Sequence, residues 1–283
     1  MNKVKIITDS TCDLSLQMYQ EMDVEVIPFH VNFNDESYLD LVEMDSDQLV
    51  EKVKETKIFP KTAAASAGVF YETFKKYIDQ GYDVLYLGIG SGLSGAFQIA
   101  KSVIHDLPEG RVFLVDSQNL SSGSGLLLRK AVGFRDQGMS AEQIKEEVEK
   151  IVPRVRSQFI VDTLEYLHRG GRCSGTARLI GTLLKMHPLI RVIDGKMIVA
   201  KKPRGTLRKA VDAMLEYFYK DLDKVDPDCI FITHVVSDEN EKYIREKITP
   251  LIPNANIVST KAGSVIGSHC GPKTIGILYI VNE

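Results

Sequence analysis

The chain has 283 residues, of which 44% are hydrophobic and 26% are charged, and its formal net charge is −3. These proportions are ordinary for globular proteins, so they exclude a disordered or fibrous chain. The slightly acidic balance offers no broad cationic surface for nucleic acid or for an anionic membrane.

The first half of the chain alternates apolar runs with helical patterns, which predicts parallel strands joined by crossover helices. The apolar runs expected to form strands are 4–8, 24–31, 84–89 and 112–115. Helices are expected at 47–54, 95–104 and 122–135. Ser66 is a suitable cap for a further helix, whose apolar stripe is Phe70, Phe74, Tyr77 and Ile78. Together these elements predict a Rossmann-like α/β domain.

A break in the pattern follows the next predicted helix. Ser140 and Gln143 form a capping box for a helix that reaches about Val152, where Pro153 follows. We place a domain boundary at this break. The expected division is an N-terminal α/β domain of residues 1–155 and a C-terminal domain of residues 156–283.

The second half has the pattern of an antiparallel sheet. Asp194 and Gly195 form a two-residue hairpin signal between the apolar runs 189–192 and 197–200. Further strands are expected at 157–162, 230–234, 256–259 and 276–281, and helices near Leu179, Ala210 and Lys242. The C-terminal domain is therefore predicted to be α+β, with antiparallel strand pairing.

Several features bear on cellular location and on metal binding. The longest apolar runs, such as 275–281, are far shorter than the roughly 20 residues that cross a bilayer. The first residues contain no signal-peptide core, so we expect a cytoplasmic protein. The cysteines are far apart in sequence and form no paired metal-ligand motif, so we expect reduced thiols and no metal site. They are Cys12, Cys173, Cys229 and Cys270.

A glycine-rich loop joins the strand expected at 84–89 to the helix that begins near Gly95. Glycines let a backbone approach a ligand closely, and the free amides and dipole at a helix start attract an anion. Ser91 and Ser94 add hydroxyl donors. Because ligands usually bind at the carboxyl ends of parallel strands, this loop is a candidate site for a carboxylate or a phosphate.

Other interpretations of this loop stay open at the level of sequence. Gly90, Gly92 and Gly95 match the G-x-G-x-x-G pattern, and Asp116 lies about where a ribose-binding acid is expected, so an NAD(P)-dependent oxidoreductase is an alternative. A serine hydrolase using Ser91 or Ser94 is a weaker one, because no serine lies in a G-x-S-x-G elbow. A purely structural turn is also possible.

Five segments in the same order along the chain resemble the DegV family of bacterial fatty-acid-binding proteins. They are 7–14, 61–66, 91–96, 164–172 and 267–276. The clearest is Ser91-Gly92-Leu93-Ser94-Gly95-Ala96, which is similar to the family's Ser-x-x-Leu-Ser-Gly-Thr loop. The sequence departs from the family pattern at Ala63, Ala65 and Ala96, where Ser, Pro and Thr are common. These departures put ligand preference in question rather than family membership.

The resemblance implies a site between the two domains that binds one long-chain fatty acid and needs no cofactor. Thr62 and Ser94 would bond the carboxylate and His269 would join them, while Ser91, Gly92 and Gly95 would support the loop. The acyl chain would lie in an apolar tunnel. Each of the three ligand-contact residues also has a structural interpretation, as a turn cap, a helix cap or a backbone partner.

The resemblance also implies a partner protein. In the family, a separate fatty-acid kinase phosphorylates the presented carboxylate, and the acyl phosphate feeds phospholipid synthesis. The binding protein itself would not be a catalyst. Arg172 is the expected contact to the kinase and Arg204 a weaker one, because guanidinium groups suit carboxylates on a partner. Apart from the resemblance, we expect transient contact with a membrane, because a carrier must be loaded somewhere.

Overall fold

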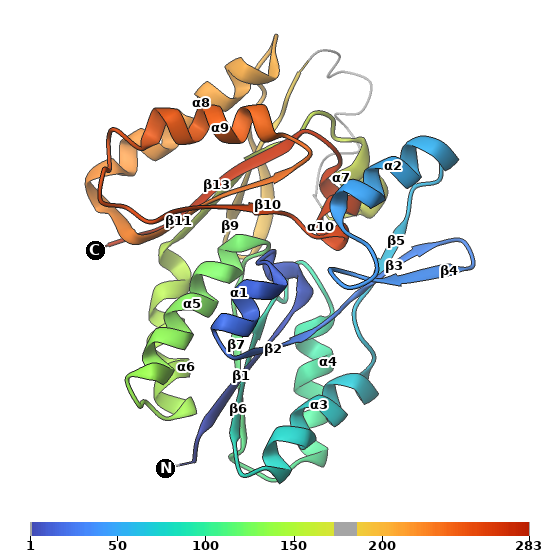
Figure 1. Cartoon of the computed structure of the whole chain (residues 1–283), viewed down its shortest axis with the longest axis vertical. Helices are drawn as coiled ribbons and strands as arrows, with labels where there is room; N and C mark the ends of the chain where they lie inside the picture. Colours follow the sequence, from blue (N-terminus) through green and yellow to red (C-terminus); the bar gives the residue numbers. More distant parts are fainter. Residues whose placement is uncertain (1, 173–185, 283) are drawn as a thin grey trace.

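The computed structural model of the chain describes residues 2–172 and 186–282. Cys173 and the helix expected near Leu179 lie outside the described residues. A four-stranded sheet occupies the lower half of the molecule and a six-stranded sheet the upper half, while a small three-stranded sheet projects to one side (Figure 1). The predicted combination of a parallel α/β part and a separate, mainly antiparallel part is confirmed.

All the strand pairs of the lower sheet are parallel, in the order β2-β1-β6-β7. The strands span Val4–Asp9 (β1), Val24–Ile27 (β2), Asp83–Gly88 (β6) and Val112–Asp116 (β7). From β1 the chain moves to β2 on one side and later to β6 on the other. The loops after β1 and β6 therefore diverge at a topological switch point, where open α/β sheets bind ligands.

Helices cover both faces of this sheet (Figure 1). Ile7 and Tyr86 pack with one helix pair, and Ile6 and Leu85 pack with the other, since neighbouring residues of a strand point to opposite faces. The first pair is α3 (Ala67–Asp79) and α4 (Ala96–Val103), and the second is α5 (Ser122–Asp136) and α6 (Ala141–Ile151), with α1 (Leu16–Glu21) beside it.

The predicted helix caps are present. Ser66 is the N-cap of α3 and accepts a hydrogen bond from the Val69 amide. Ser140 and Gln143 form the capping box of α6. The helix expected at 47–54 is α2 (Ser46–Thr56). These helix starts follow from local side-chain chemistry, which satisfies amides that the first turn leaves free.

The upper sheet has the strand order β10-β9-β8-β13-β11-β12. Its strands are β8 (Val155–Ile160), β9 (Leu189–Ile193), β10 (Lys196–Lys201), β11 (Val225–Val235), β12 (Ile257–Lys261) and β13 (Thr274–Val281). The pairing is antiparallel except between β11 and β12, which are joined through helix α9 (Asp238–Ile248) as parallel neighbours must be. Asp194 and Gly195 form the predicted hairpin turn, with φ of 48° and 71°.

The two faces of the upper sheet have different partners. Ile277 and Tyr279 of β13 pack with α9 and α8 (Leu207–Asp221), which cover the outer face. Leu278 and Ile280 point the other way and join the core that contains α5 and α6. The inner face of the sheet therefore packs directly on the lower half of the molecule.

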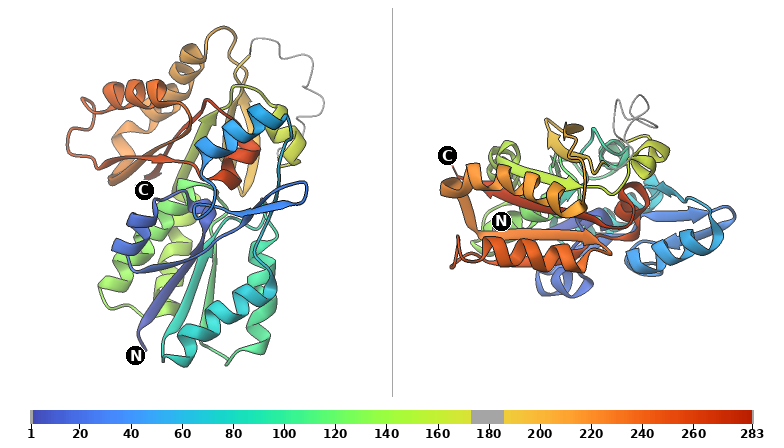
Figure 2. Two further views of the ribbon diagram at one scale, coloured as in Figure 1. Left: turned by 45° about the vertical axis from the view of Figure 1, so that its right-hand side comes forward. Right: turned by 90° about the horizontal axis from the view of Figure 1, so that it is seen from above.

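The expectation of a single strand over 24–31 is wrong. β2 ends at Ile27, and after Pro28 and Phe29 the chain enters β3 (His30–Phe33) of the projecting sheet, whose order is β4-β3-β5. Proline cannot donate to a strand ladder, so Pro28 marks the exit from the parallel sheet. The other strands of this sheet are β4 (Glu36–Leu39) and β5 (Lys61–Ala63), visible at the side in Figure 2.

Two short helices that the sequence did not predict lie beside this projection, and they pack against each other. α7 (Glu165–Gly170) spans most of the 164–172 segment. The start of α10 (Ser264–Cys270) is held by two carboxylates from distant parts of the chain. Asp13 accepts from the Gly263 amide at 2.8 Å, and Asp40 accepts from the Val265 amide at 3.2 Å.

Short 3-10 turns complete the described elements, at Ser10–Cys12, Ile104–Asp106, Val152–Arg154 and Leu222–Lys224. Over residues 2–172 and 186–282, no helix combines the length and the apolar character that a membrane span requires. Within the same ranges, no group of three or more His, Cys, Asp or Glu side chains is placed to hold a metal ion.

Candidate functional site

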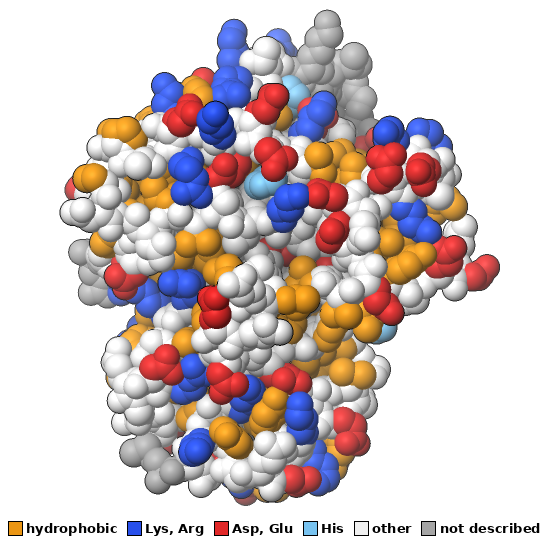
Figure 3. Space-filling view, viewed as in Figure 1, with side chains coloured by type: hydrophobic (Ala, Val, Ile, Leu, Met, Phe, Trp, Pro, Cys, Tyr) orange, Lys and Arg blue, Asp and Glu red, His pale blue; other side chains and the backbone are white. Residues whose placement is uncertain are grey.

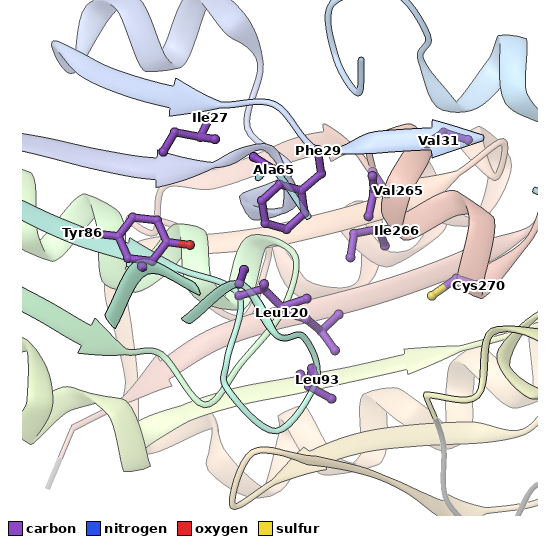
Figure 4. Packing of buried hydrophobic residues seen from close by; sticks show 14 of the residues in the cluster. Ile27, Phe29, Val31, Ala65, Tyr86, Leu93, Leu120, Val265, Ile266 and Cys270 are labelled. Atoms are coloured by element: carbon purple, nitrogen blue, oxygen red, sulfur yellow. The ribbon is translucent and has the colours of Figure 1, made fainter. Parts of the chain in front are cut away.

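A pocket lies at the carboxyl ends of β1 and β6, between the lower sheet, the projecting sheet and α10. Most of its wall is apolar. Phe29, Leu120 and Ile266 reach it from three different segments, and Figure 4 shows them converging on the same space. The polar side chains in its lining are Thr11, Thr62, Ser94, Arg172 and His269.

The central polar contact of the pocket joins two distant parts of the chain. Thr62 Oγ1 lies 2.8 Å from His269 Nε2, although the residues are 207 positions apart. Thr62 is held by β5, where it pairs with Val31 of β3. His269 is on the last turn of α10. The projecting sheet and α10 therefore assemble this pair.

His269 is neutral at physiological pH. Burial, and secondly the positive charge of Arg172, lower the pKa of its imidazole from 6.5 to about 4. Its Nδ1 atom is buried and has no hydrogen-bond partner among the residues that the structure describes. The ring therefore contributes one N–H donor and no positive charge.

Ser94 has its hydroxyl placed for a ligand. Its oxygen accepts a hydrogen bond from the Ala96 amide at 3.2 Å, at the start of α4. Within residues 2–172 and 186–282 its hydroxyl hydrogen has no acceptor, and the side chain lines the pocket. Ser94 is thus able to accept from the first amide of α4, whose N-cap is Gly95, and to donate into the pocket at the same time.

Ser91 does not line this pocket. Its amide and its hydroxyl both donate to Asp116, at 3.0 and 2.5 Å, and the Gln118 amide donates to the same carboxylate. Asp116 therefore holds the glycine-rich loop to the loop after β7. Both of its oxygens are in use, so the carboxylate is poorly placed to bind a ribose.

Two of the three glycines in the loop are required by contacts within the chain. A Cβ atom on Gly90 would lie 2.7 Å from the Asn119 amide nitrogen, and one on Gly92 would lie 2.6 Å from the carbonyl oxygen of Gly195 in the β9–β10 hairpin. Gly95 has open space in the same direction. The protein's own backbone thus fills the space that a pyrophosphate would need, which argues against the dinucleotide interpretation.

The hydrolase interpretation lacks support from geometry. His269 bonds Thr62, and the hydroxyl of Ser91 bonds Asp116, so neither loop serine has a histidine as its bonded base in the described part of the chain. A serine without such a base is a weak nucleophile.

The two candidate arginines lie in different places. Arg172 is exposed, lines the pocket, and donates to the Gly170 carbonyl at 2.7 Å. Arg204 is exposed and is not part of the lining. The structure therefore brings together Thr62, Ser94, His269 and Arg172, and it leaves Ser91, Gly92, Gly95 and Arg204 outside the pocket wall.

Asp9 and Thr11 are site residues that the sequence reasoning missed, although both belong to the 7–14 segment. Asp9 is fully buried at the end of β1 and accepts from the Thr11 hydroxyl, the Tyr86 hydroxyl and the Ile89 amide. Burial raises the pKa of this carboxyl. Because Thr11 gives its hydroxyl hydrogen to Asp9, it presents no donor to the pocket.

A second cavity adjoins the first and shares Leu120, Ile266 and Cys270 with it. It extends along the inner face of the upper sheet to Gly276 and Leu278. The hydroxyls in its wall are bonded elsewhere: Ser121 to Asp13, Ser157 to Asn119, Thr233 to Ser122 and Thr260, and Thr274 to the Cys270 carbonyl. The combined space is therefore polar at one end and apolar along the rest.

Comparison with known proteins covers the whole fold. Residues 3–282 match the family described as uncharacterised protein, DegV family. The chain is 35% identical over 281 residues to a DegV domain-containing protein of Clostridium acetobutylicum, with 99% of each chain covered. The chain belongs to the DegV family. The combination of a parallel sheet and a mainly antiparallel sheet is thus a DegV fold.

Solved structures are similar to the chain over nearly their full length. A fatty-acid-binding DegV family protein from Thermus thermophilus is 30% identical, covers 100% of both chains and gives a TM-score of 0.91. A stearic acid-binding protein from Eubacterium ventriosum is 26% identical, with a TM-score of 0.88 and coverage of 99% of this chain and 98% of the other.

The departures from the DegV pattern fall in different surroundings. Ala65 and Ala96 are buried in the core, where small side chains pack against neighbours. Ala63 is exposed and lines the pocket beside Thr62. Of the three, Ala63 is the one that lines the pocket.

Proposed function

We propose that this chain binds one long-chain fatty acid and is not itself a catalyst. The carboxylate is held by the hydroxyls of Thr62 and Ser94, with His269 joined to them through its contact with Thr62, and the acyl chain lies in the two adjoining cavities between the sheets. The observation that carries the proposal is the pairing of hydroxyl and imidazole donors at one end of an otherwise apolar space. Membership of the DegV family supports it.

The head group gives orientation. A buried carboxylate needs donors, and hydrogen bonds to a charged group each contribute about 1.5 to 3 kcal/mol. Thr62 and Ser94 supply two hydroxyls, and neutral His269 orients the first of them. Arg172 adds a positive charge at the exposed rim of the pocket.

The acyl chain gives affinity. Each methylene removed from water contributes about 0.8 kcal/mol, so a dozen contribute on the order of 10 kcal/mol before ordering costs are subtracted. The second cavity provides the apolar wall for the far part of the chain, because its hydroxyl groups bond groups outside the cavity wall or, for Thr274, a backbone carbonyl.

The carboxylate end lies beside an exposed arginine, which suits transfer to a partner. We propose that a separate ATP-dependent fatty-acid kinase docks there, with Arg172 and secondarily Arg204 as contacts, and converts the carboxylate to an acyl phosphate for phospholipid synthesis. Guanidinium groups bind carboxylates on a partner in a two-point geometry. No cofactor of the binding protein enters this scheme.

The setting proposed for this activity is the cytoplasm, with transient membrane contact during loading and no nucleic acid partner. On the face in Figure 3, Lys and Arg lie among Asp and Glu, which does not favour phosphate backbones. We also propose the division into domains 1–155 and 156–283, since β8, the first strand of the upper sheet, begins at Val155.

Extraction of purified protein under denaturing conditions, followed by mass spectrometry, tests the binding proposal. We expect about one long-chain fatty acid for each chain. Recombinant protein that carries none, and that takes up none from a fatty-acid solution, would contradict it.

The kinase step needs its own assay. With a fatty-acid kinase, ATP and loaded protein, the Arg172→Ala variant should form acyl phosphate more slowly per bound fatty acid, with the fatty-acid content of each sample measured by mass spectrometry because Arg172 also lines the pocket. Arg135→Ala on α5, which is not part of the pocket lining, is the control. Equal rates for both variants would remove Arg172 from the docking surface.

A further inference from the structure

Gly170 makes an unusually close contact with the ring of His269. A Cβ atom added to Gly170 would lie 2.0 Å from His269 Nδ1 and 2.8 Å from Cε1. Gly170 is the last residue of α7, and the positive φ at this helix end belongs to the next residue, Gly171. The absence of a side chain at Gly170 is therefore required by the imidazole ring and not by the backbone conformation.

This contact decides which nitrogen of the ring carries the hydrogen. In glycine, a hydrogen atom replaces Cβ, so a Cα–H bond of Gly170 points at Nδ1. A lone pair on Nδ1 accepts such a contact weakly, whereas an N–H there would meet the C–H head-on. Nδ1 is also buried and has no hydrogen-bond acceptor among the described residues. The neutral ring is therefore stable with its hydrogen on Nε2.

The position of that hydrogen determines what Thr62 offers a ligand. When Nε2 carries it, the ring donates to Thr62 Oγ1 across the 2.8 Å contact, and the threonine hydrogen is free to point into the pocket. When Nδ1 carries it, Nε2 must accept from Thr62, and the pocket then faces oxygen lone pairs. The first arrangement attracts a carboxylate and the second repels it, because an ionised carboxylate only accepts hydrogen bonds.

We propose that Gly170 is a positioning residue that fixes His269 in its Nε2–H tautomer and so makes Thr62 a donor to an anionic head group. This inference rests on the proposed fatty-acid site. It assigns to α7 a role in selecting ionised acids over neutral esters of the same chain length. Arg172 supports the arrangement, since its guanidinium holds the Gly170 carbonyl at 2.7 Å.

The burial of His269 is consistent with this role. Desolvation, with the charge of Arg172 adding to it, keeps the pKa of the imidazole near 4, so the ring carries a single hydrogen at neutral pH. A tautomer can be fixed only in a ring that is neutral, because the protonated form has hydrogens on both nitrogens.

The first test reads the tautomer directly and needs no ligand. Long-range proton–nitrogen NMR spectra of protein with 15N-labelled histidine distinguish the two ring nitrogens, and a His269→Asn sample assigns the signals. We expect a protonated Nε2 and an unprotonated Nδ1 in delipidated wild-type protein. A protonated Nδ1, or a mixture of tautomers, would overturn the inference even if the protein binds fatty acid.

The second test uses a variant with a matched control. In Gly170→Ala the ring has to move, so we expect at least a tenfold loss of affinity for a fatty acid and little change for its methyl ester. Gly133→Ala on α5 is the control, because a Cβ there meets nothing within 4 Å. Equal losses for acid and ester would indicate that Gly170 only shapes the pocket. If wild-type protein binds no fatty acid at all, the proposed function fails, whereas the tautomer measurement still stands.

Discussion

Replacing Thr62 with valine tests the head-group site at its centre. The substitution puts a methyl group where the hydroxyl was and keeps the branched side chain that suits β5. It removes the donor that we assign to the ligand carboxylate and also the acceptor for His269 Nε2, which lies 2.8 Å away. Binding and stability should therefore both change, for different reasons.

The two effects can be separated in size. A hydrogen bond to a charged acceptor is worth about 1.5 to 3 kcal/mol, which corresponds to an affinity loss of about 10- to 150-fold. The unpaired Nε2–H of His269 costs about 1 to 3 kcal/mol in the free protein as well as in the complex, so most of that cost appears in the free energy of unfolding. An ester, which has no anionic acceptor, should lose much less affinity than the acid.

Displacement of a fluorescent fatty acid from delipidated protein measures these affinities, and urea denaturation measures the stability. Thr249→Val is the matched control, because its hydroxyl bonds the Arg245 carbonyl at the end of α9 and is exposed. We expect unchanged fatty-acid affinity in that control. If Thr62→Val also binds the acid as tightly as wild type does, Thr62 is not a carboxylate ligand and the site must be redrawn.

Three further predictions concern the tail, the imidazole and the loop. Ala262→Leu places three carbons in the second cavity, so affinity for the longest acyl chains should fall about 50-fold, at about 0.8 kcal/mol per displaced methylene. Leu278→Ala enlarges the same cavity and should shift the co-purified fatty acids to longer chains. Identical mass-spectrometric profiles of the bound fatty acids would refute this prediction. The pKa of His269 is about 4 in the folded protein and 6.5 ordinarily, so the unfolded chain binds more protons between these values and the free energy of unfolding falls as the pH drops through that window. Denaturation of His269→Gln should show a smaller fall in this free energy than denaturation of the wild-type protein. An equal fall in both proteins would contradict the assignment. In Gly92→Val the new Cβ would lie 2.6 Å from the Gly195 carbonyl oxygen and must displace it. The substitution should therefore lower the free energy of unfolding by about 1 to 3 kcal/mol. Unaltered denaturation would show that the β9–β10 hairpin moves aside without cost.

The elements that the sequence predicted well are those set by neighbouring residues. The capping box of Ser140 and Gln143 and the hairpin at Asp194 and Gly195 need only a few adjacent side chains and torsion angles. The run 24–31 was misread because its apolar pattern continues through Pro28, although the proline itself is a local signal for leaving the sheet. Giving that signal more weight would have found the break.

Helix α10 shows what local patterns do not contain. It has seven residues, and its start is held by Asp13 and Asp40, which are more than 200 positions away. Such a helix depends on tertiary contacts, because a short isolated helix is not stable. The meeting of His269 with Thr62 is therefore set by the fold, and before the structure it was reachable only through the resemblance to the DegV family.

The structure sorts the hydroxyl groups of the site by what they already bond. Sequence chemistry treated Ser91 and Ser94 alike as donors to an anion, but Ser91 gives its hydrogen to Asp116 and Thr11 gives its hydrogen to Asp9. A hydroxyl that bonds a carboxylate within the protein is not available to a second carboxylate. Among the described residues that line the pocket, this leaves the hydroxyls of Thr62 and Ser94 without an acidic partner. Asp9 and Asp116 thus leave the carboxylate of the proposed fatty acid only the two hydroxyls that we assign to it.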